Sequence, residues 1–196
     1  LLEGRKSQTR RILKPQPELR DFGNGLQPWM PVGGIYHDSW RLPYTPGQFL
    51  WVREELQMGF DARTPICHAT YASDGADLDL TPEGAVQWAE TRKRNTIPSF
   101  HMPRWASRPT LEVTEVRVQR LWDMEGQHPS ESDAIAEGVN SIHHGDGAYC
   151  YSAFRNEPHP KNWCDPTDAF RELWNSLHGP EAWDANPWVA ASTFTT

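Results

Sequence analysis

The chain opens with Leu1-Leu2-Glu3-Gly4-Arg5-Lys6-Ser7-Gln8-Thr9-Arg10-Arg11-Ile12, which concentrates basic side chains in an otherwise acidic protein. We interpret residues 1–14 as the end of a helix that runs into a basic turn. In such a turn Gly4 would let the backbone approach a ligand, and Lys6 and Thr9 would point the same way, one helical turn apart. Arg11 could then bind a phosphate or a carboxylate with its planar guanidinium. The alternative is a basic turn that is merely solvated.

The composition limits the class of protein. A hydrophobic content of 37% in 196 residues can bury one sizeable core, so we expect a single domain over residues 1–196. The net charge of −7 disfavours a protein that coats nucleic acid by charge alone. Three scattered cysteines, no apolar run of membrane-spanning length and no signal-peptide pattern favour a reducing, cytoplasmic location. Because the chain begins with Leu1 rather than Met, we expect residues upstream to be missing.

The order of apolar, Pro and Gly residues predicts short strands joined by long loops. Residues 15–46 are rich in Pro and Gly and predict an ordered loop insertion. Residues 49–52 predict a buried strand that ends at Arg53-Glu54, and residues 66–72 predict a second strand. Residues 188–194 predict the last strand. Together with two helices, these elements predict an α+β fold in which strands surround a barrel-like core.

The segment 111–121 predicts the clearest strand, and also an irregularity within it. Leu111 and Val113 fall on one parity of the alternation, whereas Val116 and Val118 fall on the other. One face of a regular strand cannot hold both pairs. An extra residue near Thr114 or Glu115 would bring all four to the same face, so we predict a β-bulge there.

The first predicted helix begins near Ser130, a plausible N-cap with Asp133 three residues further on, and Gly138 closes it. Residues 140–164 follow with His, Gly, Tyr and Asn in an order typical of a loop, so we expect a second insertion there.

The second predicted helix has stronger boundaries. Asp165 is a candidate N-cap, Pro166 fits the first helical position, and Gly179-Pro180 stops the helix. The apolar residues recur at helical spacing and form one stripe, composed of Phe170, Leu173, Trp174 and Leu177.

Gly4-Arg5-Lys6-Ser7-Gln8-Thr9-Arg10-Arg11 resembles the Gly-x-Lys-x-x-Thr-x-Arg signature of ASCH domains, which are small PUA-like β-barrels. Ser7 and Gln48 stand where relatives often have Thr and Asp. Four further blocks are similar to the longer phage and prophage members of the family, namely residues 46–54, 101–108, 133–139 and 186–189. The resemblance spans most of the chain and implies a PUA-like barrel with a few flanking helices, with the insertions at 15–46 and 140–164.

Some small bacterial ASCH proteins are amidohydrolases that deacylate N4-acetylcytidine with a Lys, a Thr and a Glu. The resemblance assigns these roles to Lys6, Thr9 and Glu137, without a cofactor or a metal. A carboxylate in the last turn of a short helix is disfavoured as an anion unless a cation such as Lys6 or Arg11 lies opposite. Alone, Glu137 would be read equally well as a solvated helix end.

Other residues are weaker candidates for a ligand site. Glu54 is a rival carboxylate, but beside Arg53 it predicts an exposed ion pair at the barrel rim. Trp105, flanked by Arg104 and Arg108, could stack a base while the arginines meet phosphates, or it could simply pack. Five Cys and His residues towards the C-terminal end can be considered for zinc, but their spacings fit no usual zinc pattern; they are His143, His144, Cys150, His159 and Cys164.

Three classes of function remain open. The first is an amidohydrolase acting on a small acylated cytidine-type nucleoside. The second is a non-catalytic module that binds single-stranded RNA or a modified nucleotide, and the third is a phage morphogenesis or host-interaction protein whose partners are proteins. The acidic net charge favours a small ligand over long RNA, because counterion release would contribute little outside one turn.

Overall fold

The computed structural model describes residues 6–21, 23, 26–29, 42–60, 67–91, 95–124, 126, 132–145 and 147–196. The chain divides into two compact units. Unit 1 contains Leu1–Gln48 and Glu112–Thr195, and unit 2 contains Phe49–Leu111 together with Thr196. The prediction of a single domain over residues 1–196 stays a prediction. Among the described residues, none of the helices is long and apolar enough to cross a membrane.

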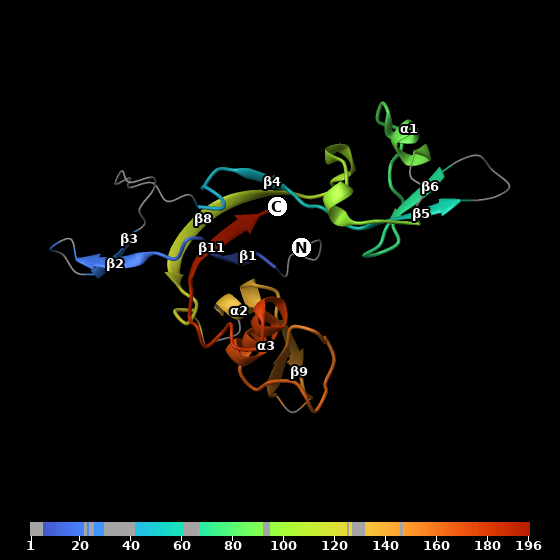
Figure 1. Cartoon of the computed structure of the whole chain (residues 1–196). Helices are drawn as coiled ribbons and strands as arrows, with labels where there is room; N and C mark the ends of the chain where they lie inside the picture. Colours follow the sequence, from blue (N-terminus) through green and yellow to red (C-terminus); the bar gives the residue numbers. More distant parts are fainter. Residues whose placement is uncertain are drawn as a thin grey trace. The chain divides into compact units, whose positions relative to one another are not determined.

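Unit 1 is built on an antiparallel sheet in the order β1-β11-β8 (Figure 1). Its strands are β1 (Gln8–Ile12), β11 (Trp188–Thr195) and β8 (Thr110–Arg120), of which β8 begins in unit 2. In Figure 1 the strands β8 and β11 curve together, so the sheet is curled like half of a small barrel. The predicted α+β class is therefore confirmed.

Strand β1 corrects the prediction that residues 1–14 are the end of a helix that runs into a basic turn. Residues 8–12 pair with β11 along their whole length, from Gln8 opposite Thr193 to Ile12 opposite Val189. Pairing with a strand almost two hundred residues away is a tertiary effect that local sequence does not report. The basic turn thus becomes the edge of a sheet, and its side chains alternate between two faces.

The bulge predicted in the long strand is confirmed. Thr193 of β11 lies opposite Glu115, whereas the next residue, Phe194, lies opposite Val113. Thr114 is therefore the extra residue, and its Oγ1 donates to the carbonyl of Thr193 at 3.3 Å. The register shift puts Leu111 and Val113 on the same side as Val116 and Val118, as the parity argument required.

The described part of unit 1 contains two helices. Helix α2 (Asp133–Ala136) is a single turn with Ser132 as N-cap, so the predicted start at Ser130 is wrong, and Ser130 itself lies outside the described residues. Helix α3 (Pro166–His178) matches its prediction, because the Asp165 side chain accepts a hydrogen bond from the backbone N–H of Thr167 at 2.7 Å. The core of unit 1 gathers on α3 and the sheet, and its buried side chains include Leu121, Val139, Phe170, Trp174, Trp183 and Val189.

Both expected insertions contain strands. The loop predicted over 140–164 holds the antiparallel hairpin β9 (Asn140–His143) and β10 (Tyr149–Ser152), so that prediction is wrong in part. Cys150 and Tyr151 are buried on this hairpin, which explains why a polar segment orders itself. In the other insertion, β2 (Glu18–Asp21) pairs with β3 (Leu26–Trp29), and residues 30–41 lie outside the described residues.

Unit 2 has its own sheet and core. Strands β5 (Leu56–Phe60), β6 (Cys67–Tyr71) and β7 (Thr96–Ile97) hydrogen-bond in the order β6-β5-β7. Helix α1 (Ala85–Glu90) and two short 3₁₀ helices, η1 (Ser99–His101) and η2 (Arg104–Ala106), complete the unit. The second predicted strand is confirmed as β6, while β5, β7 and α1 were not predicted. The buried side chains include Leu56, Met58, Tyr71, Ile97 and Met102.

The remaining strand of unit 2, β4 (Phe49–Trp51), hydrogen-bonds to β8, the strand that the two units share. It was predicted to be buried, and this is wrong. Phe49 is 66% exposed, and Leu50 and Trp51 are only half-buried. An apolar run therefore predicted the strand but not what covers it.

Candidate active site

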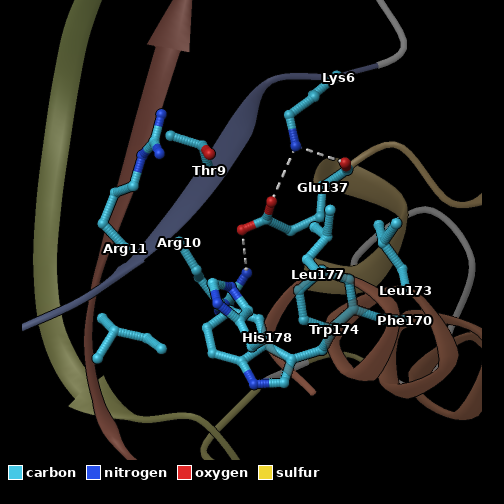
Figure 2. A pocket seen from close by; sticks show the side chains of 11 residues that line it. Lys6, Thr9, Arg10, Arg11, Glu137, Phe170, Leu173, Trp174, Leu177 and His178 are labelled. Atoms are coloured by element: carbon cyan, nitrogen blue, oxygen red, sulfur yellow. Dashed lines mark hydrogen bonds and ion pairs between the residues drawn. The ribbon is translucent and has the colours of Figure 1, made fainter. Parts of the chain in front are cut away.

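A pocket of about 370 Å³ lies in unit 1, with strand β1 on one side and helix α3 on the other (Figure 2). This volume falls within the range of about 300–1,000 Å³ that small-ligand sites usually have. The polar lining comes from β1 and the end of α2, and the apolar lining comes mainly from α3. The lining residues are Lys6, Thr9, Arg10, Arg11, Ile12, Glu137, Phe170, Leu173, Trp174, Leu177 and His178.

Helix α3 forms the apolar wall because its apolar residues recur at helical spacing. Phe170 and Trp174 lie one turn apart and are 3% and 2% exposed, so they belong to the core as well as to the wall. Leu177, at the end of the predicted stripe, is 69% exposed and lies at the pocket instead. The indole Nε1 of Trp174 is buried and has no hydrogen-bond partner in the described part of the chain. The wall therefore contains one unused donor.

His178 ends helix α3 and lines the same pocket. Its ring lies 4.3 Å from the ring of Trp174, measured between centroids. Partial burial, and then the positive charges of Lys14 and Arg11, lower the pKa of His178 below its ordinary value of 6.5. The imidazole is consequently neutral at neutral pH, and one of its nitrogens can accept a hydrogen bond.

Glu137 enters the pocket from the C-terminal end of α2, where it is the C-cap residue and only 5% exposed. Gly138 follows with φ 101°, a left-handed conformation that favours glycine. A Cβ atom on Gly138 would lie 3.5 Å from the Cβ of Lys6. The turn after α2 thus passes directly beside Lys6, which brings two distant parts of the sequence into contact.

Lys6 is the cation that lies opposite Glu137. Its Nζ donates to Glu137 Oε2 at 2.9 Å and to the backbone carbonyl of Glu137 at 2.7 Å (Figure 2). The carbonyls at the end of a helix lack partners within the helix, so Lys6 satisfies one of them and the carboxylate together. The carboxylate is 4% exposed while the lysine side chain is 32% exposed, which leaves Lys6 accessible from the pocket.

Arg10 is a site residue that sequence reasoning missed. Its side chain is fully buried, Nη1 donates to Glu137 Oε1 at 2.9 Å, and Nη2 donates to Asp133 Oδ2. Asp133 in turn accepts from Arg117 Nη2 at 2.9 Å. Positive and negative groups therefore alternate through five side chains. We call them the Arg10 network: Lys6, Glu137, Arg10, Asp133 and Arg117.

Side chains alternate between the two faces of β1, which explains why Arg10 reaches Glu137 whereas Thr9 and Arg11 do not. Lys6, Gln8 and Arg10 share a parity, and Gln8 accepts a hydrogen bond from Arg10 Nη1. Thr9 and Arg11 have the opposite parity, and Figure 2 shows their side chains on the other side of β1 from the Lys6–Glu137 contact. The expectation that Lys6 and Thr9 point the same way is therefore wrong. A strand prediction for residues 8–12 would have revealed Arg10.

Thr9 and Arg11 nonetheless line the pocket. Thr9 is half-buried, and within the described residues its hydroxyl forms no hydrogen bond with Lys6 or Glu137. Arg11 is exposed and has no carboxylate partner there. Gly4, also expected at the site, lies outside the described residues.

Three other predicted site residues, Glu54, Arg104 and Trp105, lie in unit 2. The expected exposed ion pair at Glu54 is wrong, because the Glu54 side chain is 11% exposed and its partner is Arg108, with Arg108 Nε donating to Oε1 at 3.1 Å. Trp105 is half-buried and packs edge-on against Trp88, with ring centroids 5.4 Å apart. Its indole is thus occupied by packing.

Among the residues considered for zinc, Cys150, His143 and His159 have other contacts, and His159 Nδ1 accepts a hydrogen bond from the backbone N–H of Lys161 at 3.1 Å. Cys150 is buried and its Sγ lies 3.5 Å from Asn162 Nδ2. His143 packs its ring edge-on against Tyr149 at 5.3 Å. Throughout the described ranges, no three His, Cys, Asp or Glu side chains are placed together so that they could hold a metal ion.

Comparisons with known proteins assign neither a family nor a function to the chain. No family model, no curated protein and no solved structure matches the chain. Membership of the ASCH family therefore stays a prediction that the sequence blocks carry. What bears on function is the pocket, with a buried ion pair in its polar wall and aromatic rings in its apolar wall.

Proposed function

We propose that this chain is an ASCH-type domain of PUA-like fold whose pocket hydrolyses the amide of an N4-acylated cytidine-type nucleoside. The observation that carries the proposal is the 2.9 Å contact between Lys6 Nζ and Glu137 Oε2, in the wall of a pocket that Thr9 also lines. These are the three residues to which the resemblance assigns catalysis. Lys6 and Glu137 are 131 residues apart in the sequence, so their meeting at one pocket is independent support.

The two walls of the pocket suit the two parts of such a substrate. The ring of a cytidine-type base is flat, and the rings of Phe170 and Trp174 offer its face an apolar surface. The acyl amide would then face the polar wall, where Lys6 is partly exposed. The curled antiparallel sheet with its bulge, which positions β1, supports the PUA-like assignment.

In the proposed hydrolysis, the oxygen of a water molecule or of Thr9 attacks the carbonyl carbon of the acyl group. Lys6 takes up the proton that this oxygen loses, once the ammonium proton of Lys6 has passed to Glu137 across their contact. Glu137 gives that proton to the N4 nitrogen as the C–N bond breaks, which releases the cytidine amine. If Thr9 attacks first, a second step follows in which water cleaves the acyl ester and restores the hydroxyl.

The test is the conversion of N4-acetylcytidine to cytidine and acetate, followed by chromatography. We expect turnover by the wild type, and a loss of at least about a hundredfold in kcat for Lys6→Ala and for Glu137→Gln, the size usual for a general acid or base. Thr9→Ala separates the two routes, since it abolishes turnover only if Thr9 is the nucleophile. The matched controls are Lys161→Ala and Glu157→Gln, two exposed positions in unit 1 outside the pocket.

Full activity of the Lys6→Ala variant would rule out the proposed mechanism. A second candidate is binding of a modified nucleoside without turnover. One observation favours it, namely that among the described residues Lys6 Nζ donates two hydrogen bonds to Glu137 and none to Thr9. Calorimetric binding of N4-acetylcytidine by a wild-type protein that does not turn it over would select this second function.

A further inference from the structure

Unit 2 carries a group of rings and guanidinium groups that do not belong to its buried core. Phe49, Trp51 and Arg53 are two residues apart in and just after β4, so their side chains share one side of the extended backbone. Phe49 is 66% exposed and Arg53 is exposed. An exposed phenylalanine and a tryptophan on the same side of a strand are typical of a surface that binds a partner.

Two guanidinium groups are held over the Trp51 ring. The guanidinium carbon of Arg53 lies 4.4 Å from the centroid of that ring, and that of Arg104 lies 5.7 Å from it. Both distances are within the range of cation–π attraction. Arg53 Nη1 also donates to the backbone carbonyl of Phe100 at 3.2 Å, which ties η1 to the same surface.

The 3₁₀ helix η1 adds two more rings. Phe100 is 64% exposed, and its ring centroid lies 4.1 Å from that of His101, which is also exposed. Large apolar side chains with this exposure usually mark an interaction site. We call the whole set the aromatic–basic surface, made of Phe49, Trp51, Arg53, Phe100, His101 and Arg104.

The charges on this surface are available to a ligand. Within the described part of the chain neither Arg53 nor Arg104 is paired with a carboxylate. Arg108 in the same unit contrasts with them, because it is bound to both Glu54 and Asp74. Unit 2 also carries little of the acidic excess of the protein, with seven Lys and Arg against eight Asp and Glu between Phe49 and Leu111.

We propose that the aromatic–basic surface binds single-stranded nucleic acid, with bases stacked on the exposed rings of Phe49 and Phe100 and phosphates paired with Arg53 and Arg104. A single strand repeats a flat base and an anion at each nucleotide, which is the combination that these side chains complement. In a duplex the bases are already stacked, so the rings would have no partner. An acidic peptide would pair with the arginines but would leave the rings without flat partners.

This inference corrects where the sequence placed the stacking ring. Trp105 packs on Trp88 and Arg108 is neutralised by two carboxylates, so neither serves an exposed strand. The inference also stands apart from the proposed hydrolysis. The two proposals use residues of different units and share none of their side chains.

The test measures the fluorescence anisotropy of a labelled single-stranded RNA of about 10 nucleotides, a usual site size, in the presence of the full chain. The corresponding DNA strand and an unlabelled duplex serve as competitors. We expect affinity to fall as salt is raised, because phosphates exchange counterions for Arg53 and Arg104. Arg53→Ala and Arg104→Ala should each reduce the slope of log K against log salt by about 0.7, the value for one phosphate contact in a single strand.

Ring variants separate stacking from charge. Phe49→Ala and Phe100→Ala should each weaken binding by about tenfold or more, at every salt concentration and without a change in the salt slope. Phe154→Ala is the matched control, since this ring is 52% exposed in unit 1, and Arg171→Ala is the control for the arginines. Because Phe49 and Phe100 are exposed, both variants should keep the wild-type unfolding midpoint.

Two results would overturn the inference. One is the absence of binding by folded wild-type protein at low salt, and the other is binding that Phe49→Ala and Phe100→Ala leave unchanged. Tighter binding of the duplex than of the single strand would count against it equally. Hydrolysis of N4-acetylcytidine should keep its wild-type rate in both ring variants, so failure here is distinguishable from failure of the proposed enzyme.

Discussion

Each unit contains a cluster of paired charges around one arginine, and the two clusters differ in burial. The Arg10 network of unit 1 and the set Arg108, Glu54 and Asp74 of unit 2, which we call the Arg108 cluster, both place an arginine against two carboxylates. The Arg10 side chain is 0% exposed, whereas that of Arg108 is 25% exposed. Both guanidiniums also lie near an aromatic ring, Phe170 in one case and Tyr71 in the other.

The difference lies in what each arrangement leaves accessible. In the Arg10 network the carboxylate that Arg10 holds is also bound to Lys6, and Lys6 faces a pocket. In the Arg108 cluster both carboxylates belong to Arg108, and Ser73 Oγ completes the set by donating to Glu54 Oε2 at 2.9 Å. Buried ion pairs are a weak source of stability but a precise way to orient a group. We therefore regard Arg10 as a positioning residue for Glu137. Arg108, in contrast, only holds Glu54 and Asp74 together at the surface of unit 2.

Arg10→Met should have the largest effect on this contrast. It leaves Glu137 and Asp133 buried without their shared cation, and breaking one side of such a pair costs about 3–5 kcal/mol. The measurement is unfolding by urea, followed by tryptophan fluorescence and by hydrogen exchange of peptides from β1 and α2. Arg11→Met is the control on the same strand, and we expect little change because Arg11 is exposed.

A second outcome of that experiment addresses positioning. If Arg10→Met fails to fold, Arg10→Lys keeps the charge and loses the forked geometry. We expect it to lower kcat on the acylated nucleoside more than it raises KM, since the orientation of Glu137 is disturbed while the aromatic wall is intact. Wild-type kcat in a stable Arg10→Lys protein would mean that Arg10 only fills the core.

Arg108→Met should have a smaller effect, of about 1–2 kcal/mol. It removes hydrogen bonds to Glu54 and Asp74, but water can reach the carboxylates that remain, which are 11% and 43% exposed. Hydrogen exchange should rise in peptides of unit 2, around Glu54 and Ser73, and not in those from α2. A loss as large as that of Arg10→Met would erase the distinction between the two arrangements.

The sequence predicted the elements whose signals are local. The N-cap at Asp165 with Pro166 defined α3, and the change of parity between Val113 and Val116 located a bulge that the strand pairing confirms. It could not predict β1 as a strand, because that strand exists through its pairing with β11 at the other end of the chain. The division at Gln48 and Phe49 likewise depends on contacts between distant residues.

For the site, sequence reasoning supplied the residue types more readily than their partners. It selected Lys6 and Glu137, which meet, but it also selected Glu54, Arg104 and Trp105, which lie in the other unit. Arg10 was missed because a helical reading of β1 hid the parity that it shares with Lys6. Tertiary packing determines which charged side chains pair. The sequence alone therefore does not show which carboxylate an arginine will contact.

Asp74→Asn tests the exposed part of the Arg108 cluster and should have a smaller effect still. The hydrogen bond from Arg108, followed by that from the backbone N–H of Ala76, lowers the pKa of Asp74 below its ordinary value of 3.8. A lowered carboxyl pKa contributes stability above 3.8, and this contribution is lost as the pH falls through the folded-state pKa. The wild type should exceed Asp74→Asn slightly in unfolding midpoint at neutral pH and match it in strong acid. Salt near 1 M should also reduce the difference, since the screening length is then about 3 Å.

His178→Gln should have the smallest effect, and in a different pH window. Because partial burial and the charges of Lys14 and Arg11 lower the pKa of His178, the unfolded chain binds a proton near its ordinary value of 6.5 before the folded protein does. The wild type should therefore lose stability as the pH falls below about 6.5, and the loss should stop once the pH is below the folded-state pKa.

In His178→Gln this part of the pH dependence should disappear, whereas any constant offset at higher pH reports the packing against Trp174. Parallel stability curves for the two proteins between about pH 7 and pH 5 would show that the folded protein does not lower the pKa of His178. Asp74→Asn should leave the wild-type slope in this window unchanged, because its own titration occurs below 3.8, so the two variants separate the pocket from the Arg108 cluster by pH alone.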